Sequence, residues 1–190
     1  MFNVIKMCIY KIFKQYFLSF RIFVLFIIIL LNNTLGFSMD EHNRVVVDEI
    51  NKNKMLIGET TLDVFKSSPF KGWFDLEYNY YEPDEKIVDQ LKDISKGIKI
   101  LIFLGTWCPD SRTDFPRFVK ILDKIHFDKS NLKIISVDRK KEDPDGLSKK
   151  YNIEYVPTFI FFDGKAELGR IVEMPKISLE ADMLKILTSK

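Results

Sequence analysis

Residues 98–111 read IKILIFLGTWCPDS, and they join a long apolar run to the residue with the most distinctive chemistry in the chain. The run from Ile98 to Leu104 predicts a strand covered on both faces, like a central parallel strand. Cys108 follows it and opens a helix predicted to extend to about Phe127. The first N–H groups of a helix are unpaired and carry partial positive charge, so they favour a thiolate there. The sequence therefore predicts a nucleophilic cysteine at a strand-to-helix turn.

The chain from residue 60 onward alternates predicted helices and strands, which indicates a layered α/β domain. We expect Pro116 to kink the helix that follows Cys108, because proline removes one backbone hydrogen bond. Residues 72–81 are dense in aromatic side chains; core packing is the favoured interpretation, and a docking surface is the alternative. The expected elements are a short helix near residues 60–65, helices over 87–97, 109–127, 143–151 and 178–187, and strands over 98–104, 132–137, 158–162 and 168–173.

The N-terminal residues differ in kind from the rest of the chain. Residues 1–38 are predicted to be a signal peptide, because basic residues up to Arg21 lead into the uncharged run 22–31, with cleavage after Gly36 or Ser38. The alternative is an uncleaved membrane anchor, although this run is shorter than the roughly 20 residues that span a bilayer. We therefore expect an exported protein, periplasmic or secreted, with the membrane involved only through this segment if it stays uncleaved.

Length and charge indicate one folded domain with a mixed surface. The chain has 190 residues and a net charge of +2, which gives no reason to expect a nucleic-acid partner. Residues 39–83 are interpreted as a leader and extension, and residues 84–190 as the main domain. Cleavage of the signal peptide would remove Cys8 and leave Cys108 as the single cysteine of the mature chain.

The chain combines three separated motifs: Trp107-Cys108 after the central strand, Pro116 eight residues past the cysteine, and the loop Val156-Pro157-Thr158. Together they resemble the thioredoxin-like superfamily over residues 87–190. The resemblance implies a thioredoxin-like fold with a central mixed β-sheet flanked by helices, preceded here by an N-terminal extension. It also implies that Pro157 is a cis-proline lying against Cys108, and that its loop receives an extended substrate backbone.

Two departures from the family pattern affect the same chemical step. Ser111 replaces the resolving cysteine, and Ile102 replaces the buried aspartate that assists its deprotonation. The sequence thus looks like a monothiol branch among exported bacterial proteins. The supporting active-site loop consists of Trp107, Pro109, Asp110, Ser111 and Arg112, in which Ser111 is placed to donate a hydrogen bond to the sulfur, Arg112 adds positive charge and Asp110 opposes both.

Three functions remain open at this stage. In the first, Cys108 attacks a protein disulfide or a low-molecular-weight disulfide, without a cofactor, and an external thiol resolves the mixed disulfide. In the second, the fold is a redox-inactive binding or folding-assistance module that holds extended peptides between the Pro157 loop and the aromatic residues 73–81. Peroxide reduction is the weakest of the three, because the chain lacks the Pro-x-x-x-Thr-x-x-Cys arrangement of peroxiredoxins.

No metal site is predicted. His42 and His126 have no ligand partner at a recognised spacing. Residues 142–146 lack the alternating ligands of a calcium loop, so they are interpreted as a helix cap. The basic run 139–141 is interpreted as a solvated turn.

Overall fold

Strand β3 (Ile98–Leu104) lies inside a mixed sheet in the computed structural model. It pairs in parallel with β4 (Leu132–Ser136) and antiparallel with β5 (Thr158–Asp163). All of its residues except Lys99 are buried. The predicted central strand, covered on both faces, is thereby confirmed.

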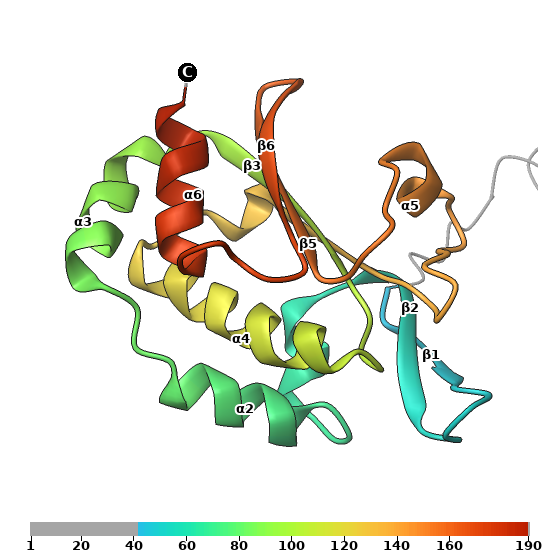
Figure 1. Cartoon of the computed structure of the whole chain (residues 1–190). Coiled ribbons are helices and arrows are strands. Elements are labelled where there is room, and N and C mark those ends of the chain that lie inside the picture. Colours follow the sequence, from blue (N-terminus) through green and yellow to red (C-terminus); the bar gives the residue numbers. More distant parts are fainter. Residues whose placement is uncertain (1–41, 190) are drawn as a thin grey trace, which may run out of the picture. The chain divides into compact units, whose positions relative to one another are not determined.

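The structure describes residues 42–189, and the predicted signal peptide and Cys8 lie outside these residues. Over the described part the sheet has six strands in the order β1-β2-β4-β3-β5-β6 (Figure 1). None of the helices in this part is long and apolar enough to cross a membrane. The remaining elements are β1 (Arg44–Val47), β2 (Lys54–Thr60), the 3₁₀ helix η1 (Leu62–Lys66), α2 (Lys71–Tyr80), α3 (Glu85–Ile94), α4 (Pro109–Lys124), the 3₁₀ helix η2 (Lys129–Asn131), α5 (Leu147–Lys150), β6 (Ala166–Val172) and α6 (Leu179–Thr188).

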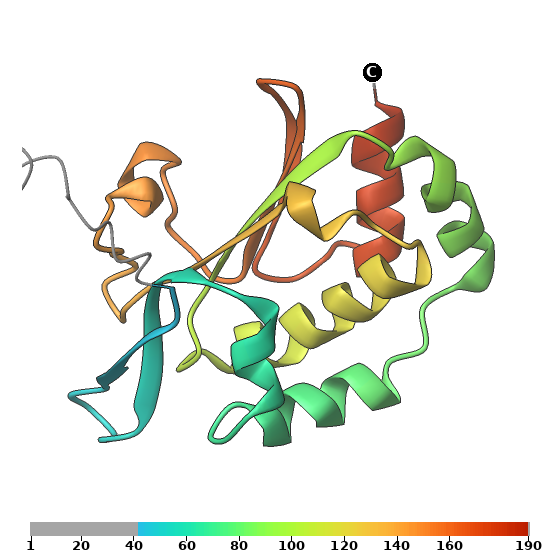
Figure 2. The same cartoon turned by 180° about the vertical axis from the view of Figure 1, so that it is seen from behind.

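The two faces of the sheet bury two separate apolar clusters, because successive side chains of a strand point to opposite faces. Ile100 and Ile102 of β3 belong to the larger cluster, under α3, α4 and α6. Leu101 and Phe103 belong to the smaller cluster, together with Leu147 of α5. Figures 1 and 2 show α3, α4 and α6 on one side of the sheet and α5 on the other.

The first described residues of the predicted leader and extension, from residue 42 onward, lead directly into the sheet. Residues Arg44–Val47 form β1, which pairs antiparallel with β2, and β2 pairs antiparallel with β4. The strand was missed because only three consecutive valines mark it, with no alternation of polar and apolar residues. The N-terminal hairpin therefore extends the sheet on its β4 side.

Most of the other predicted elements are confirmed. Helix α3 ends before Gly97, which has φ +78°, and Ser178 caps α6 by accepting a hydrogen bond from the Ala181 N–H. Helix α4 continues through Pro116 to Lys124. The exception is α5, which begins at Leu147 rather than at the predicted Asp143-Pro144 pair.

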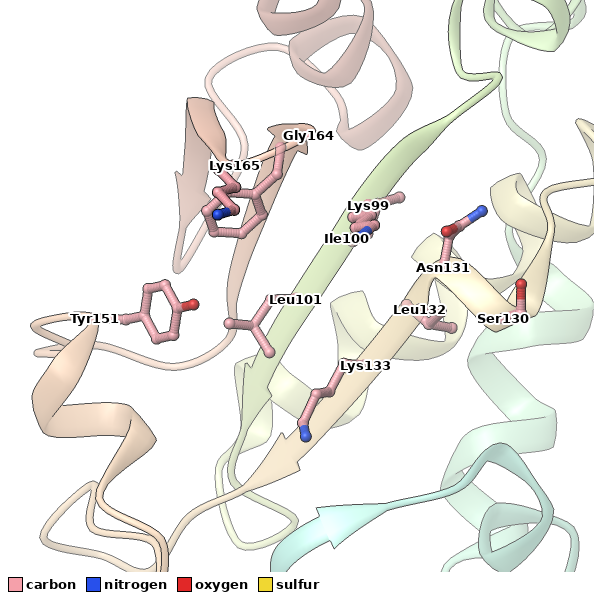
Figure 3. A pocket seen from close by; sticks show the side chains of 11 residues that line it. Lys99, Ile100, Leu101, Ser130, Asn131, Leu132, Lys133, Tyr151, Gly164 and Lys165 are labelled. Atoms are coloured by element: carbon pink, nitrogen blue, oxygen red, sulfur yellow. The ribbon is translucent and has the colours of Figure 1, made fainter.

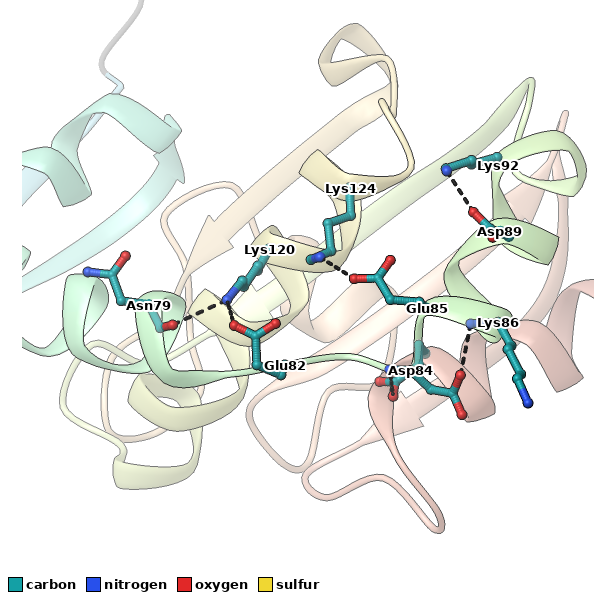
Figure 4. Close-up of polar contacts among 10 residues, drawn as sticks. Asn79, Glu82, Asp84, Glu85, Lys86, Asp89, Lys92, Lys120 and Lys124 are labelled. Carbon is teal, nitrogen blue, oxygen red and sulfur yellow. Dashed lines mark hydrogen bonds and ion pairs between the residues drawn. The ribbon is translucent and has the colours of Figure 1, made fainter.

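Most aromatic residues of α2 pack into or against the core, as the favoured interpretation predicts, whereas Tyr80 is 81% exposed. Phe74 is buried and contacts the rings of Phe65 and Phe115. Beyond α2, the connection to α3 is attached to α4 by lysines (Figure 4). Lys120 donates to Glu82 and to the Asn79 carbonyl, and Lys124 donates to Glu85.

Asp143 holds the turn before α5 through three backbone N–H groups, those of Asp145, Leu147 and Ser148. Burial alone would raise the pKa of Asp143, but these hydrogen bonds outweigh it and hold the pKa below its usual value. The carboxylate therefore stabilises the folded state at neutral pH, and this contribution is lost as the pH falls through the lowered pKa.

We predict that Asp143→Ala lowers the free energy of unfolding by about 1–2 kcal/mol at pH 7, as for the loss of a helix cap. The difference from wild type should shrink as the pH falls below about 4, because the unfolded chain then takes up a proton that the folded carboxylate binds only at lower pH. Urea unfolding at several pH values measures both effects. Asp145→Ala, at an exposed neighbouring position, is the control and should change little.

Candidate functional site

Cys108 lies where β3 has ended and α4 begins, as the N-cap residue of α4. Its N–H donates to the Gly105 carbonyl at 2.8 Å, and its carbonyl accepts from the Arg112 N–H at 3.1 Å. The residue is 7% exposed, and it is the free cysteine of the described part of the chain. The turn thus presents one thiol at the N-terminus of a 16-residue helix.

The loop Val156-Pro157-Thr158 lies against this thiol. The Cys108 Sγ donates to the Val156 carbonyl at 3.3 Å, and the peptide bond between Val156 and Pro157 is cis. The Pro157 carbonyl accepts from the Glu173 N–H at 2.8 Å, and the Thr158 hydroxyl donates to the Tyr155 carbonyl at 2.7 Å. Cys108 and Val156 are 48 positions apart in sequence, and the structure brings them together. Only the family resemblance predicted this contact.

Ser111 does not have the role expected for it. Its side chain is fully buried, and its hydroxyl oxygen accepts from the Gly105 N–H at 3.1 Å. The expectation that this hydroxyl donates to the Cys108 sulfur is wrong, because no such bond occurs among the described contacts. The Ser111 hydroxyl instead satisfies the buried backbone donor of Gly105, in the loop before Cys108.

Trp107 is fixed on more than one side. Its indole N–H donates to the Val137 carbonyl at 2.9 Å. A Cβ added to Gly105 would lie 2.7 Å from the Trp107 ring, so only glycine leaves room for the indole there. The guanidinium of Arg139 lies 5.1 Å from the centre of the Trp107 ring.

Arg139 is a site residue that the sequence analysis missed. Its run was interpreted as a solvated turn, but its guanidinium makes a bidentate ion pair with Asp48, at 2.7 to 3.0 Å. The Asp48 side chain is 2% exposed and comes from the turn after β1. A basic residue next to two lysines gives no sequence signal for such a partner 91 positions away.

The N-terminal hairpin reaches the active-site loop at a second place. The Leu56 N–H of β2 donates to the buried Thr106 hydroxyl at 3.1 Å. The Thr106 carbonyl accepts from Arg112 Nε at 2.6 Å, which holds the Arg112 side chain next to the turn. Pro109 and Asp110 are exposed, so water screens the negative charge of Asp110.

Asp114 is a buried carboxyl group two residues beyond Arg112 on α4. Burial raises the pKa of Asp114 to about 6, Arg117 at 4.0 Å opposes this, and the charges of Asp110 and Glu77 add to it. The group is therefore ionised at pH 7 at a cost to the folded state.

Other parts of the described chain offer no metal centre. No group of three or more His, Cys, Asp or Glu residues between residues 42 and 189 lies where it could hold a metal ion. A hollow of about 500 Å³ lies over β3 and β4, lined by Lys99, Leu101, Lys133 and Tyr151 among others (Figure 3). None of the predicted site residues lines it, so it is separate from the Cys108 site.

Comparison with known proteins gives matches over the region that contains this site. A family model described as thioredoxin matches residues 75–185. An H-type thioredoxin of Brassica campestris is 29% identical over 99 residues, covering 51% of this chain and 76% of that protein. A thioredoxin of Echinococcus granulosus is 31% identical over 86 residues, covering 44% and 75%. A solved Pseudomonas aeruginosa protein of unknown function aligns with 69% of this chain and 86% of its own, at 18% identity and a TM-score of 0.48.

We predict that Asp114→Asn raises the free energy of unfolding by on the order of 2 kcal/mol at pH 8 and leaves it almost unchanged at pH 4. The reason is that the folded state binds this proton more tightly than the unfolded state, so the wild type loses stability as the pH rises from about 4 to 6. Chemical denaturation at both pH values measures the difference.

Asp89→Asn, at an exposed position of α3, serves as the control and should change stability by less than about 0.5 kcal/mol at either pH. An equal gain for Asp114→Asn at pH 4 and pH 8 would show that the carboxyl group is not strained by its charge.

Proposed function

Because the chain belongs to the thioredoxin family, we propose that it carries out thiol–disulfide exchange with Cys108 as the nucleophile and with a thiol from another molecule as the resolving group. Its mixed sheet flanked by helices has the thioredoxin-like fold. Its substrates are disulfides or thiols of proteins or small molecules, as the thioredoxin relatives suggest.

The observation that carries the proposal is the position of the Cys108 sulfur. It lies at a helix N-terminus and within 3.3 Å of the carbonyl that precedes Pro157. The unpaired N–H groups of the first turn favour negative charge on the sulfur. An extended substrate strand beside the Val156–Thr158 loop would bring its own sulfur close to this thiol.

The reaction balances with one thiol on this protein. The Cys108 thiolate attacks one sulfur of a disulfide RSSR, forms the mixed disulfide Cys108–SR and releases RS⁻. A second thiolate R′S⁻ then attacks the mixed disulfide, takes the R–S group as RSSR′ and regenerates the Cys108 thiolate. No electrons are gained or lost by Cys108 over the full cycle, as in an isomerase or a disulfide-transfer protein.

The requirement for an external thiol is supported by the surroundings of Ser111. Position 111 holds a buried hydroxyl that accepts from the Gly105 N–H, and β3 carries Ile102 where the family resemblance places an acid. The serine hydroxyl does not attack a mixed disulfide as a thiolate does, and isoleucine cannot take a proton from a resolving thiol. The adduct on Cys108 should therefore persist until another thiol arrives.

Peptide binding without redox chemistry remains the alternative. Two observations bear on it: Cys108 is 7% exposed, and most aromatic side chains of residues 73–81, the candidate peptide surface, pack into or against the core. The low exposure favours a shielded thiol, and the packing of these aromatic rings reduces one of the two expected contact surfaces. Activity of Cys108→Ala separates the two functions, because this variant should lose exchange and retain peptide binding.

We also propose that residues 1–38 direct export, since a basic segment and a short apolar run precede the small residues Gly36 and Ser38. N-terminal sequencing of the mature protein tests this. A mature chain that begins after position 36 or 38 agrees with cleavage, and an intact Met1 contradicts it.

We predict that oxidised glutathione modifies Cys108 in the folded protein at least several-fold faster than in the chain unfolded by urea, because the helix N-terminus favours the reacting thiolate. Peptide mass spectrometry locates and quantifies the adduct. Cys108→Ser is the control and should give no adduct in this peptide. Slower modification in the folded than in the unfolded protein would contradict the proposed function.

A second prediction concerns Ser111→Cys. A thiol at this position should attack the adduct on Cys108, release the small thiol and leave a disulfide between positions 108 and 111, so the adduct lifetime should fall by at least tenfold. Mass spectrometry after removal of excess reagent follows the adduct over time. Thr113→Cys, on the same helix, is the control; an adduct equally stable in wild type and Ser111→Cys would show that the persistence has another cause.

A further inference from the structure

Arg139 has a more defined position than a surface arginine. Nε and Nη2 both donate to Asp48, and the arginine side chain remains 31% exposed. A bidentate pair with a carboxylate fixes the plane of the guanidinium. Nη1 makes no hydrogen bond among the described residues, so part of this cation is available to another anion.

The fixed cation lies beside the reactive turn. Its guanidinium is 5.1 Å from the centre of the Trp107 ring, and Trp107 precedes Cys108. The pKa of Arg139 is raised, first by the hydrogen bond with Asp48 and to a smaller extent by the charge of Cys108. The Trp107 contact places the cation next to the residue that precedes the reactive thiol.

The other charged groups around the turn do not cancel the positive charge of Arg139 at short range. Asp110 is exposed, and Arg112 contributes a second cation whose Nε is bound to the Thr106 carbonyl. Seen from far away, the charge of Asp48 cancels that of Arg139. The Asp48 carboxylate is buried, however, and it contacts only Nε and Nη2 of the guanidinium. An anion that approaches Cys108 therefore meets the half-buried guanidinium groups of Arg112 and Arg139.

We propose that Arg139 is a specificity-determining residue of the Cys108 site, which gives it a preference for disulfides that carry a carboxylate near the sulfur. This inference rests on the proposed function, because it concerns the substrates of the same thiol. In the exchange step the carboxylate pairs with Arg139 while the Cys108 thiolate forms its bond to the substrate sulfur and the other sulfur leaves as RS⁻.

Alkylation measures the charge around the sulfur without requiring disulfide exchange. Iodoacetate carries a carboxylate and iodoacetamide is neutral, so the ratio of their rate constants with Cys108 reports the local potential. The wild-type ratio should fall about threefold in Arg139→Met at low ionic strength, and high salt should reduce the wild-type ratio by a similar factor. Arg139→Lys keeps the charge and should retain most of the preference.

Arg170→Met is the matched control. Arg170 also makes a bidentate pair with a carboxylate, that of Glu167, and its side chain is 29% exposed. This variant should leave the ratio unchanged. A folded Arg139→Met with the wild-type ratio would overturn the inference and reduce Arg139 to an anchor for the hairpin. If Arg139→Met does not fold, a wild-type ratio that is insensitive to salt overturns it equally.

Two small disulfides of opposite charge then test the substrate class. Oxidised glutathione carries carboxylates and cystamine carries ammonium groups, and adduct formation on Cys108 is measured with each. Wild type should favour oxidised glutathione, and Arg139→Met should lose about threefold of that preference. If both probes form adducts and Arg139→Met keeps the wild-type preference, the role of Arg139 is contradicted and the proposed function is not. If neither probe forms an adduct, the proposed function itself is contradicted.

Discussion

The parallel pairing of β3 with β4 is the constraint on which the site depends. In a parallel pair both strands end at the same edge of the sheet. The residues that follow β3, including Trp107 and Cys108, therefore meet those that follow β4, including Val137 and Arg139. Because β3 is buried on both faces, its position in the sheet is fixed. The end of β3 then fixes where the N-terminus of α4 lies.

The sequence contains enough information for the centre of the fold and for the thiol. Apolar runs of strand length, helical spacing and turn residues identify β3, β4, α3, α4, α6 and the β5–β6 hairpin, because each of these signals is local. Cys108 is recognisable for the same reason, since its position after β3 and before a helix can be read from consecutive residues.

The parts that were missed depend on contacts between distant residues. Strand β1 is short and becomes a strand by pairing with β2, which in turn pairs with β4. Arg139 acquires its place from Asp48, and the Ser111 hydroxyl from the Gly105 N–H rather than from the neighbouring sulfur. A side chain with several available partners cannot be assigned one of them from composition or spacing.

The contacts between the N-terminal hairpin and the active-site loop also bear on the order of folding. Asp48 and Arg139 are 91 positions apart, and Leu56 and Thr106 are 50 apart, so both contacts close long loops. Contacts of this kind form late, because the entropy of loop closure is spent before they contribute stability. The hairpin leaves the ribosome before any of its partners, and the surroundings of Cys108 are completed only after most of the chain has been synthesised. During that interval the thiol is present without the guanidinium that lies beside Trp107 in the finished protein.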